Sequence, residues 1–218
     1  MTPAHRTRRR TAATAAATMA ALALLEIGGV GAATAHADTR PLRTSCNPAV
    51  DAPWVDVITT QVDPTVTDFL RMVVTPGSTG TRTDGLPRAD SVTTSVDGNA
   101  NITAAESEIL RKAEAWVGFP VQTTTSSTST STVTTTWSYN EPDRYGLYRG
   151  TRKVRGEYVK YVCVQTGPGT GSWVSAVPGG GTTGKFITYG SMDTGIVRCA
   201  QTEAAGTLRR VARDRLFC

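Results

Sequence analysis

The residue types that most often act as nucleophiles and bases are scarce in this chain, and their positions limit its chemistry. Both histidines, His5 and His36, lie within the first 37 residues, which have the pattern of an export signal. Without them the remaining chain can build neither a Ser-His-Asp nor a Cys-His catalytic group. Paired carboxylates, which suffice for glycoside hydrolysis, remain possible. The candidate pairs are Asp63 with Asp68 and Glu141 with Asp143. Neither pair has a recognisable catalytic context, so we expect a non-catalytic protein.

The four cysteines follow the export signal and are even in number. They are Cys46, Cys163, Cys199 and Cys218. In an oxidising compartment this count predicts two disulfides, and three pairings are possible. We favour Cys46–Cys163, which would tie an N-terminal arm to a central strand, and Cys199–Cys218, which would close a short loop. A zinc site would need closely spaced cysteine pairs or histidines, and the sequence offers neither after residue 37.

Two further motifs resemble ligand sites but lack an essential residue. Residues 179–185 match most of a phosphate-binding loop, yet Phe186 stands where a magnesium-binding Ser or Thr is required. We interpret this segment as a hairpin loop. Residues 97–108 resemble a calcium loop, but Ile102 occupies the position that requires glycine. The sequence therefore predicts no cofactor and no metal, and leaves calcium open as the one alternative.

The first 37 residues have the three parts of a signal peptide. Arginines within residues 6–10 precede an apolar stretch over residues 12–33, and Ala35-His36-Ala37 gives a small-x-small cleavage pattern. Cleavage there would release a secreted, extracellular chain that begins at Asp38. Loss of four arginines and one glutamate lowers the net charge from +5 to +2. A net positive charge this small does not predict a nucleic-acid partner. No segment after residue 37 is long and apolar enough to span a membrane.

The mature chain is expected to begin with an extended arm over residues 38–53, followed by a strand over residues 54–62. Asp63-Pro64 has the pattern of a helix start, although a strand through residues 65–74 fits the β-branched content nearly as well. Residues 75–87 are rich in Gly, Pro and Thr and predict a loop. A strand over residues 88–96 would then end in a turn at Asp97-Gly98.

Two amphipathic helices are expected. Thr103 and Glu106 form a capping box, and apolar residues follow at helical spacing as far as Trp116 and Val117. The second helix is predicted over residues 202–216, with leucine, valine and alanine on one face and four arginines on the other. Gly206 weakens that prediction by about 1 kcal/mol relative to alanine.

The rest of the chain predicts strands. Residues 123–138 are almost entirely Ser and Thr, which suits either an extended strand with a weak register or a solvated linker. Trp137 and Tyr139 are expected to anchor the end of this run in a core. Residues 144–150 and 153–165 are predicted to form a hairpin across Gly150-Thr151. A second hairpin is expected between residues 173–177 and 185–189.

These elements predict an α+β fold that is mainly β. We expect a signal peptide over residues 1–37, an extended N-terminal arm over 38–53, and a single secreted domain over 54–218. The domain would be a disulfide-tied, antiparallel, β-sandwich-like body with one or two short helices.

Two families share features with this chain. The paired Ser/Thr-rich segments 91–96 and 123–138 resemble the insertion strands of aerolysin-type β-pore-forming toxins, although a helix separates them here and neither has an apolar face. The signal peptide, the arm ending near Cys46 and the body around residues 137–150 and Cys163 resemble the small secreted adaptors of bacterial umbrella toxin particles. That second resemblance implies an arm that docks into one partner protein and a body that holds another.

The sequence therefore favours a secreted, non-catalytic adaptor or structural subunit that binds other secreted proteins in a hetero-oligomeric assembly, with an aerolysin-like toxin as the alternative. The arm and the Ser/Thr run supply backbone groups for a partner strand. The candidate partner-binding residues are Arg40, Leu42 and Arg43 in the arm, and Thr123, Thr124, Thr125, Thr128, Thr130 and Thr132 in the run.

Overall fold

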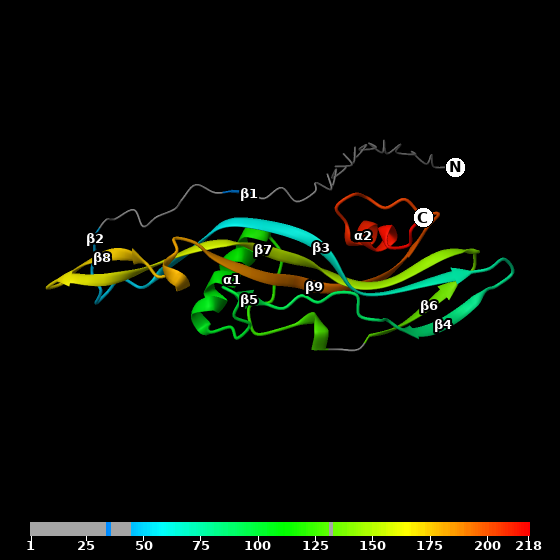
Figure 1. Ribbon diagram of the computed structural model, residues 1–218, viewed down its shortest axis with the longest axis horizontal. Helices are drawn as coiled ribbons and strands as arrows, with labels where there is room; N and C mark the ends of the chain where they lie inside the picture. The colour runs from blue at the N-terminus through cyan, green and yellow to red at the C-terminus, as the bar shows by residue number, and fades with distance from the viewer. Residues whose placement is uncertain (1–33, 36–44, 131–132) are drawn as a thin grey trace, which may run out of the picture.

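Most of the molecule is built from a few very long antiparallel strands (Figure 1). The computed structural model describes residues 34–35, 45–130 and 133–218, with residues 34–35 described as backbone only. The strands are β1 (Thr34–Ala35), β2 (Ser45–Cys46), β3 (Trp54–Val74), β4 (Gly80–Gly85), β5 (Ser95–Val96), β6 (Thr134–Tyr139), β7 (Asp143–Gly167), β8 (Thr170–Ser175) and β9 (Gly184–Arg198). The helices are α1 (Ala104–Val117) and α2 (Leu208–Asp214). The class is α+β and mainly β, as the sequence predicted.

The main sheet is organised around β7. Strand β3 pairs with β7 from Trp54 opposite Tyr161 to Val74 opposite Asp143. On the other side of β7, β8 and β9 lie one after the other along the same edge. The short strands complete the sheet, with β1 on β3, β2 on β8 and β5 on β9. This arrangement gives the elongated shape seen in Figure 1.

Both hairpins predicted from the sequence are wrong. Residues 144–150 and 153–165 lie on one continuous strand, β7, and β8 and β9 pair with β7 rather than with each other. Gly150 indicates a turn in the sequence but has another role in the structure. A Cβ placed there would lie 2.5 Å from the Thr65 carbonyl oxygen and 2.7 Å from Leu208 Cδ1. The glycine therefore permits a close approach of α2 and β3 to a continuous strand.

The helix predicted to begin at Asp63-Pro64 is also wrong, and the alternative strand is correct. Strand β3 continues through both residues, with register shifts at Val57/Thr59 and Val66/Asp68. Proline is tolerated in an edge strand because its missing N–H can face away from the ladder.

The structure also differs from the predictions for the two segments that follow. The expected loop over residues 75–87 contains β4, and the expected strand over 88–96 is reduced to β5 and isolated bridges.

Helix α1 matches its prediction. The Glu106 N–H donates to Thr103 Oγ1 at 3.3 Å, and the Thr103 N–H donates to Glu106 Oε2 at 2.7 Å, which completes the capping box. The helix ends at Gly118. Its buried residues Ile109, Leu110 and Ala113 pack in one cluster with residues of β3, β7 and β9.

Helix α2 is shorter than predicted. It begins after Thr207, whose hydroxyl accepts a hydrogen bond from the Arg210 N–H, and not at residue 202. Gly206 has φ +74°, a conformation outside the helical region, so the helix cannot extend back through it. The apolar face of this segment points into the core as predicted, because Ala212 and Leu216 are fully buried against Val66 and Tyr148.

Side chains alternate along β7 and divide the core between its two faces. Tyr148 packs with α2, and Val154 and Tyr158 pack with α1, so both helices cover the same face at successive positions. Tyr145 and Leu147 point to the other face. There they pack with Trp137 of β6 and with Leu86, which directly follows β4; β4 and β6 form a separate two-stranded ribbon. Burial of Trp137 confirms that it anchors the end of the Ser/Thr run.

Both favoured disulfides are present. Cys46 is bonded to Cys163, which joins β2 to β7, and Cys199 is bonded to Cys218, which joins the end of β9 to the C-terminus. The predicted signal peptide lies outside the described residues except for β1, and the arm residues 38–44 lie outside them entirely.

Candidate functional site

The carboxylates that could have formed a catalytic pair are engaged in separate contacts. Asp63 pairs with Arg155 at 2.9 Å, whereas Asp68 is buried and pairs with Arg88 at 3.4 Å. Five residues of extended strand separate the two acids, or about 16 Å, which exceeds the spacing used by glycosidases. Asp143 accepts a hydrogen bond from the Ala200 N–H. Glu141 forms an ion pair with Arg198.

The calcium-like segment also forms internal contacts. Asp97 lies in a tight turn, where its carboxylate accepts hydrogen bonds from the Tyr158 hydroxyl at 2.5 Å and from the Lys185 N–H at 2.8 Å. Burial and the contact with Asp97 raise the pKa of Tyr158 well above its usual value. Glu108 pairs with Arg111 on the surface of α1. Within the described part of the chain, no three histidine, cysteine or acidic residues gather as a metal site would require.

The two Ser/Thr-rich segments lie beside each other. We define the Ser/Thr ladder as residues 92–94 together with residues 126–128. Thr93 and Ser127 form an isolated antiparallel bridge, and their hydroxyls lie 3.0 Å apart. Thr94 and Ser126 have hydroxyls 2.8 Å apart, and the Thr94 N–H donates to the Ser126 carbonyl. Hydroxyl pairs and backbone hydrogen bonds therefore link these segments.

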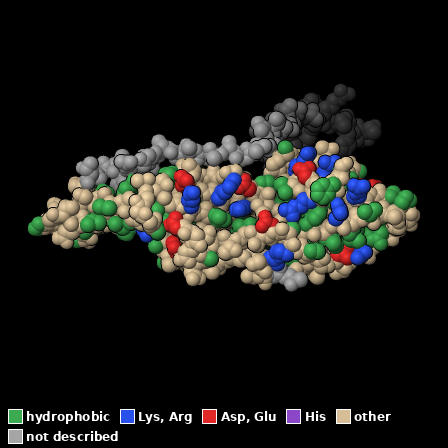
Figure 2. Space-filling view, viewed as in Figure 1, with side chains coloured by type: hydrophobic (Ala, Val, Ile, Leu, Met, Phe, Trp, Pro, Cys, Tyr) green, Lys and Arg blue, Asp and Glu red, His purple; other side chains and the backbone are tan. Residues whose placement is uncertain are grey.

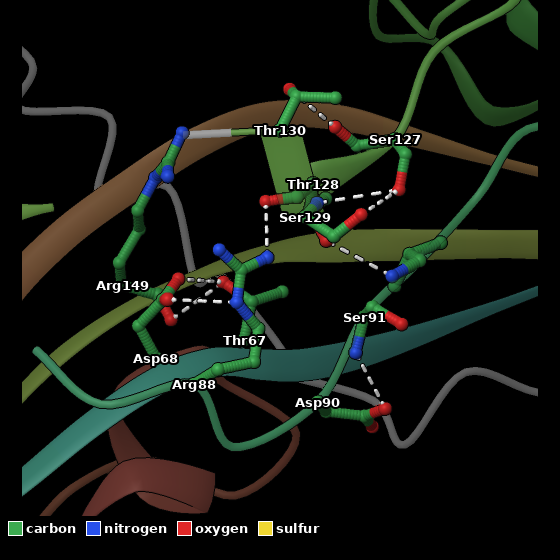
Figure 3. A network of polar contacts seen from close by, with 11 residues as sticks. Thr67, Asp68, Arg88, Asp90, Ser91, Ser127, Thr128, Ser129, Thr130 and Arg149 are labelled. Carbon is green, nitrogen blue, oxygen red and sulfur yellow. Dashed lines mark hydrogen bonds and ion pairs between the residues drawn. The ribbon is translucent and has the colours of Figure 1, made fainter. Parts of the chain in front are cut away.

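A buried ion pair fastens the Ser/Thr ladder to the long sheet (Figure 3). Asp68 is only 1% exposed, and its carboxylate accepts a hydrogen bond from the Thr67 hydroxyl at 2.8 Å. Arg88 bridges from Asp68 to the Thr128 carbonyl oxygen, to which it donates at 2.8 Å. The Val92 N–H in turn donates to the Thr128 hydroxyl at 3.0 Å. This network has no sequence motif, because its members are distant along the chain and meet only after β3 has folded.

The structure separates the predicted partner-binding residues into three groups. Arg40, Leu42, Arg43 and Thr132 lie outside the described residues. Thr128 is buried and bonded within the fold, so its side chain is not on a surface. Thr124, Thr125 and Thr130 are exposed and Thr123 is half-buried. Thr125 accepts a hydrogen bond from the Ile102 N–H, which leaves Thr124 as an exposed member near the start of the run.

A second candidate surface, the outer edge of β3, was not predicted from the sequence. We define the β3 edge as residues 59–66 on the side away from β7. Strand β1 pairs with Thr59 and Thr60. Over residues 61–66, no strand among the described residues pairs with this edge. Further along, residues 87–89 cover the edge at residues 67–69. A strand edge of this kind presents backbone donors and acceptors to another chain.

No helix within residues 45–130 and 133–218 combines the length and apolar character needed to cross a bilayer. Comparisons with protein-family models, curated proteins and solved structures found no match to this chain.

Proposed function

We propose that this protein is a secreted, non-catalytic subunit that binds other secreted proteins in a hetero-oligomeric assembly. Its two disulfides suit an oxidising compartment such as the extracellular space. The resemblance to umbrella toxin adaptors extends the proposal to an antibacterial toxin particle. In that setting the N-terminal arm docks into one partner and the β-rich body contacts another.

The observation that carries the proposal is the position of β1 on the β3 edge. Thr34–Ala35 pairs with Thr59 and Thr60, yet both residues of β1 lie within the predicted signal peptide. Cleavage after Ala37 would remove β1 and leave the β3 edge without that strand. A partner strand could then pair with residues 59–63 by β-augmentation. Pro64 cannot donate a backbone hydrogen bond, so it would limit how far such pairing extends.

The arm is fixed to the body at Ser45–Cys46. Ser45–Cys46 pairs with β8, and the disulfide to Cys163 holds it there. The segment from Asp38 to Cys46 therefore ends at a cysteine that is bonded to β7 by a disulfide. An arm attached in this way can contact a partner without loss of the fold, because the core clusters lie within residues 55–216.

A pull-down from culture supernatant, with partners identified by mass spectrometry, tests the proposal. The mature form, residues 38–218, is expected to capture a defined set of secreted proteins. A form that lacks residues 38–44 should lose this set and keep its melting temperature. A form that starts at residue 34 retains β1 and should capture less. Equal capture by all three forms would contradict both the arm and the β3 edge as binding surfaces.

The second candidate, an aerolysin-like pore-forming toxin, is favoured by one observation. The Ser/Thr-rich segments that resemble insertion strands lie side by side in the Ser/Thr ladder, held by hydroxyl pairs and the Asp68–Arg88 ion pair. Such contacts could be exchanged for others more readily than a packed apolar core. Dye release from liposomes by the purified mature protein separates the candidates, because a binding subunit is expected to cause none.

A further inference from the structure

The hairpin in which β7 turns into β8 contains no charged residue. From Tyr161 to Gly184 the sequence contains no Asp, Glu, Lys or Arg, although 19% of the whole chain is charged. We define the hairpin tip as residues 161–175, which include the end of β7 and all of β8. Figure 2 shows only hydrophobic and uncharged side chains at this extremity. A surface left in water normally mixes charges of both signs, so the tip is atypical.

Apolar side chains cover both faces of the hairpin tip. Val162 and Val174 are opposite each other on one face, and Val164 is next to them. Val164 is 46% exposed and Val174 is 47% exposed. On the other face the rings of Trp54 and Tyr161 lie 5.9 Å apart. Trp173 lies on that same face, opposite Cys163.

We propose that the hairpin tip docks on the surface of a phospholipid bilayer. In this arrangement Val164 and Val174 enter the boundary between the headgroups and the acyl chains. The half-buried rings of Tyr161 and Trp173 lie at headgroup depth, where amphipathic aromatic side chains are favoured. Lys160, which precedes Tyr161 on β7, lies at the level of the lipid phosphates.

The distribution of side chains favours lipid over a protein partner. A protein interface buries one face of a hairpin and usually includes polar or charged groups at its rim. The tip instead presents apolar groups on both faces and lacks charge on both strands, which suits immersion in a surrounding medium. The Cys46–Cys163 disulfide and the pairing of β2 with β8 hold the tip as one unit, so little order has to be gained on binding.

Two other strongly exposed hydrophobic residues, Val73 and Phe217, lack this setting. Val73, which is 67% exposed, is opposite Arg144 at the far end of β3. Phe217 lies beneath the guanidinium of Arg71, 5.7 Å from the ring centroid. Both are single apolar residues beside charges. Val73 therefore provides a matched control, since it is a surface valine on the same sheet but outside the hairpin tip.

Flotation of the mature protein with phosphatidylcholine–phosphatidylglycerol vesicles tests the proposal. The wild type is expected to float with the vesicles. The double variant V164E/V174E should lower the bound-to-free ratio at least roughly tenfold, because two charges enter the lipid boundary. V73E should float like the wild type. Both variants should keep the wild-type melting temperature, since each substitution is at an exposed position.

Two results would overturn the inference. One is the absence of wild-type protein from the floated vesicles, and the other is equal flotation of V164E/V174E and wild type. The pull-down distinguishes this inference from the proposed function. V164E/V174E should still capture the secreted partners, because its arm and β3 edge are unchanged. If the wild type does not float and V164E/V174E loses those partners, the tip belongs to a protein interface instead of a bilayer.

Discussion

At the scale of single residues, the most consequential contact is the buried ion pair between Asp68 and Arg88. Replacing Arg88 with methionine leaves a carboxylate that is 1% exposed without its cation. Removal of one partner from a buried pair costs about 3–5 kcal/mol, and we expect a value near the lower limit because Arg88 is itself 34% exposed. Urea denaturation of R88M measures the loss.

The same variant reports on how the Ser/Thr ladder is held. Arg88 donates to the Thr128 carbonyl oxygen, so amides of residues 126–130 should exchange hydrogen faster in R88M. R111M is the matched control, because Arg111 forms an exposed pair with Glu108 on α1 and its loss should cost less than about 0.5 kcal/mol. Similar losses in the two variants would contradict the role given to Arg88.

A second prediction at this scale concerns pH. Arg209 donates two hydrogen bonds to the Glu203 carboxylate, at 2.7 and 2.8 Å, and these contacts lower the pKa of Glu203. A carboxyl whose pKa is lowered by folding adds stability that is complete above its unfolded pKa and is lost as pH falls through the folded pKa. E203Q should therefore reduce the free energy of unfolding by about 1 kcal/mol at neutral pH, since Arg209 is partly solvated.

Comparing the stability of E203Q and wild type at a pH below the usual glutamate pKa checks the direction of this pH dependence. The difference between the two proteins should shrink as the solution is acidified, because the wild type then loses the charged contact as well. Thermal melting over a pH series measures it. A difference that stays constant with pH would show that Glu203 acts through packing alone.

At the scale of elements, Gly150 explains why β7 is one strand. G150A would place a methyl group 2.5 Å from the Thr65 carbonyl oxygen and 2.7 Å from Leu208 Cδ1. Overpacking of this kind costs about 1–3 kcal/mol, and contact with backbone favours the upper part of that range. Gly85 is the control, because it is also a strand residue and a Cβ there would meet nothing within 4 Å. Equal melting temperatures for G150A and G85A would show that the close approach is unimportant.

Some of these elements could be predicted from the sequence and others could not. Helix α1 was predictable because Thr103 and Glu106 cap it through contacts three residues apart. The cysteine pairing was predictable because few combinations exist. The single strand β7 was not, because Gly150-Thr151 has the local pattern of a turn while its conformation depends on β3 and α2. The Asp68–Arg88 network and the β3 edge were missed for the same reason, since both arise from pairing between distant segments.

At the scale of the whole molecule, the long sheet separates three surfaces. The β3 edge and the arm that ends at Cys46 are proposed to hold protein partners. The hairpin tip is proposed to rest on lipid at one extremity, and the Ser/Thr ladder lies on the body of the sheet (Figure 1). The β3 edge lies apart from the hairpin tip along the sheet, whereas the arm is joined to the tip through the pairing of β2 with β8 and the Cys46–Cys163 disulfide.

The most direct test of the central claim is hydrogen exchange of β3 in the complex captured by the mature protein. We predict that amides within residues 59–63 exchange freely at the outer edge of the isolated mature protein and become protected in the complex. Amides of the α1 core should change little and serve as the internal reference. A captured complex in which residues 59–63 exchange as they do in the isolated protein would contradict the proposal that a partner strand pairs with the β3 edge.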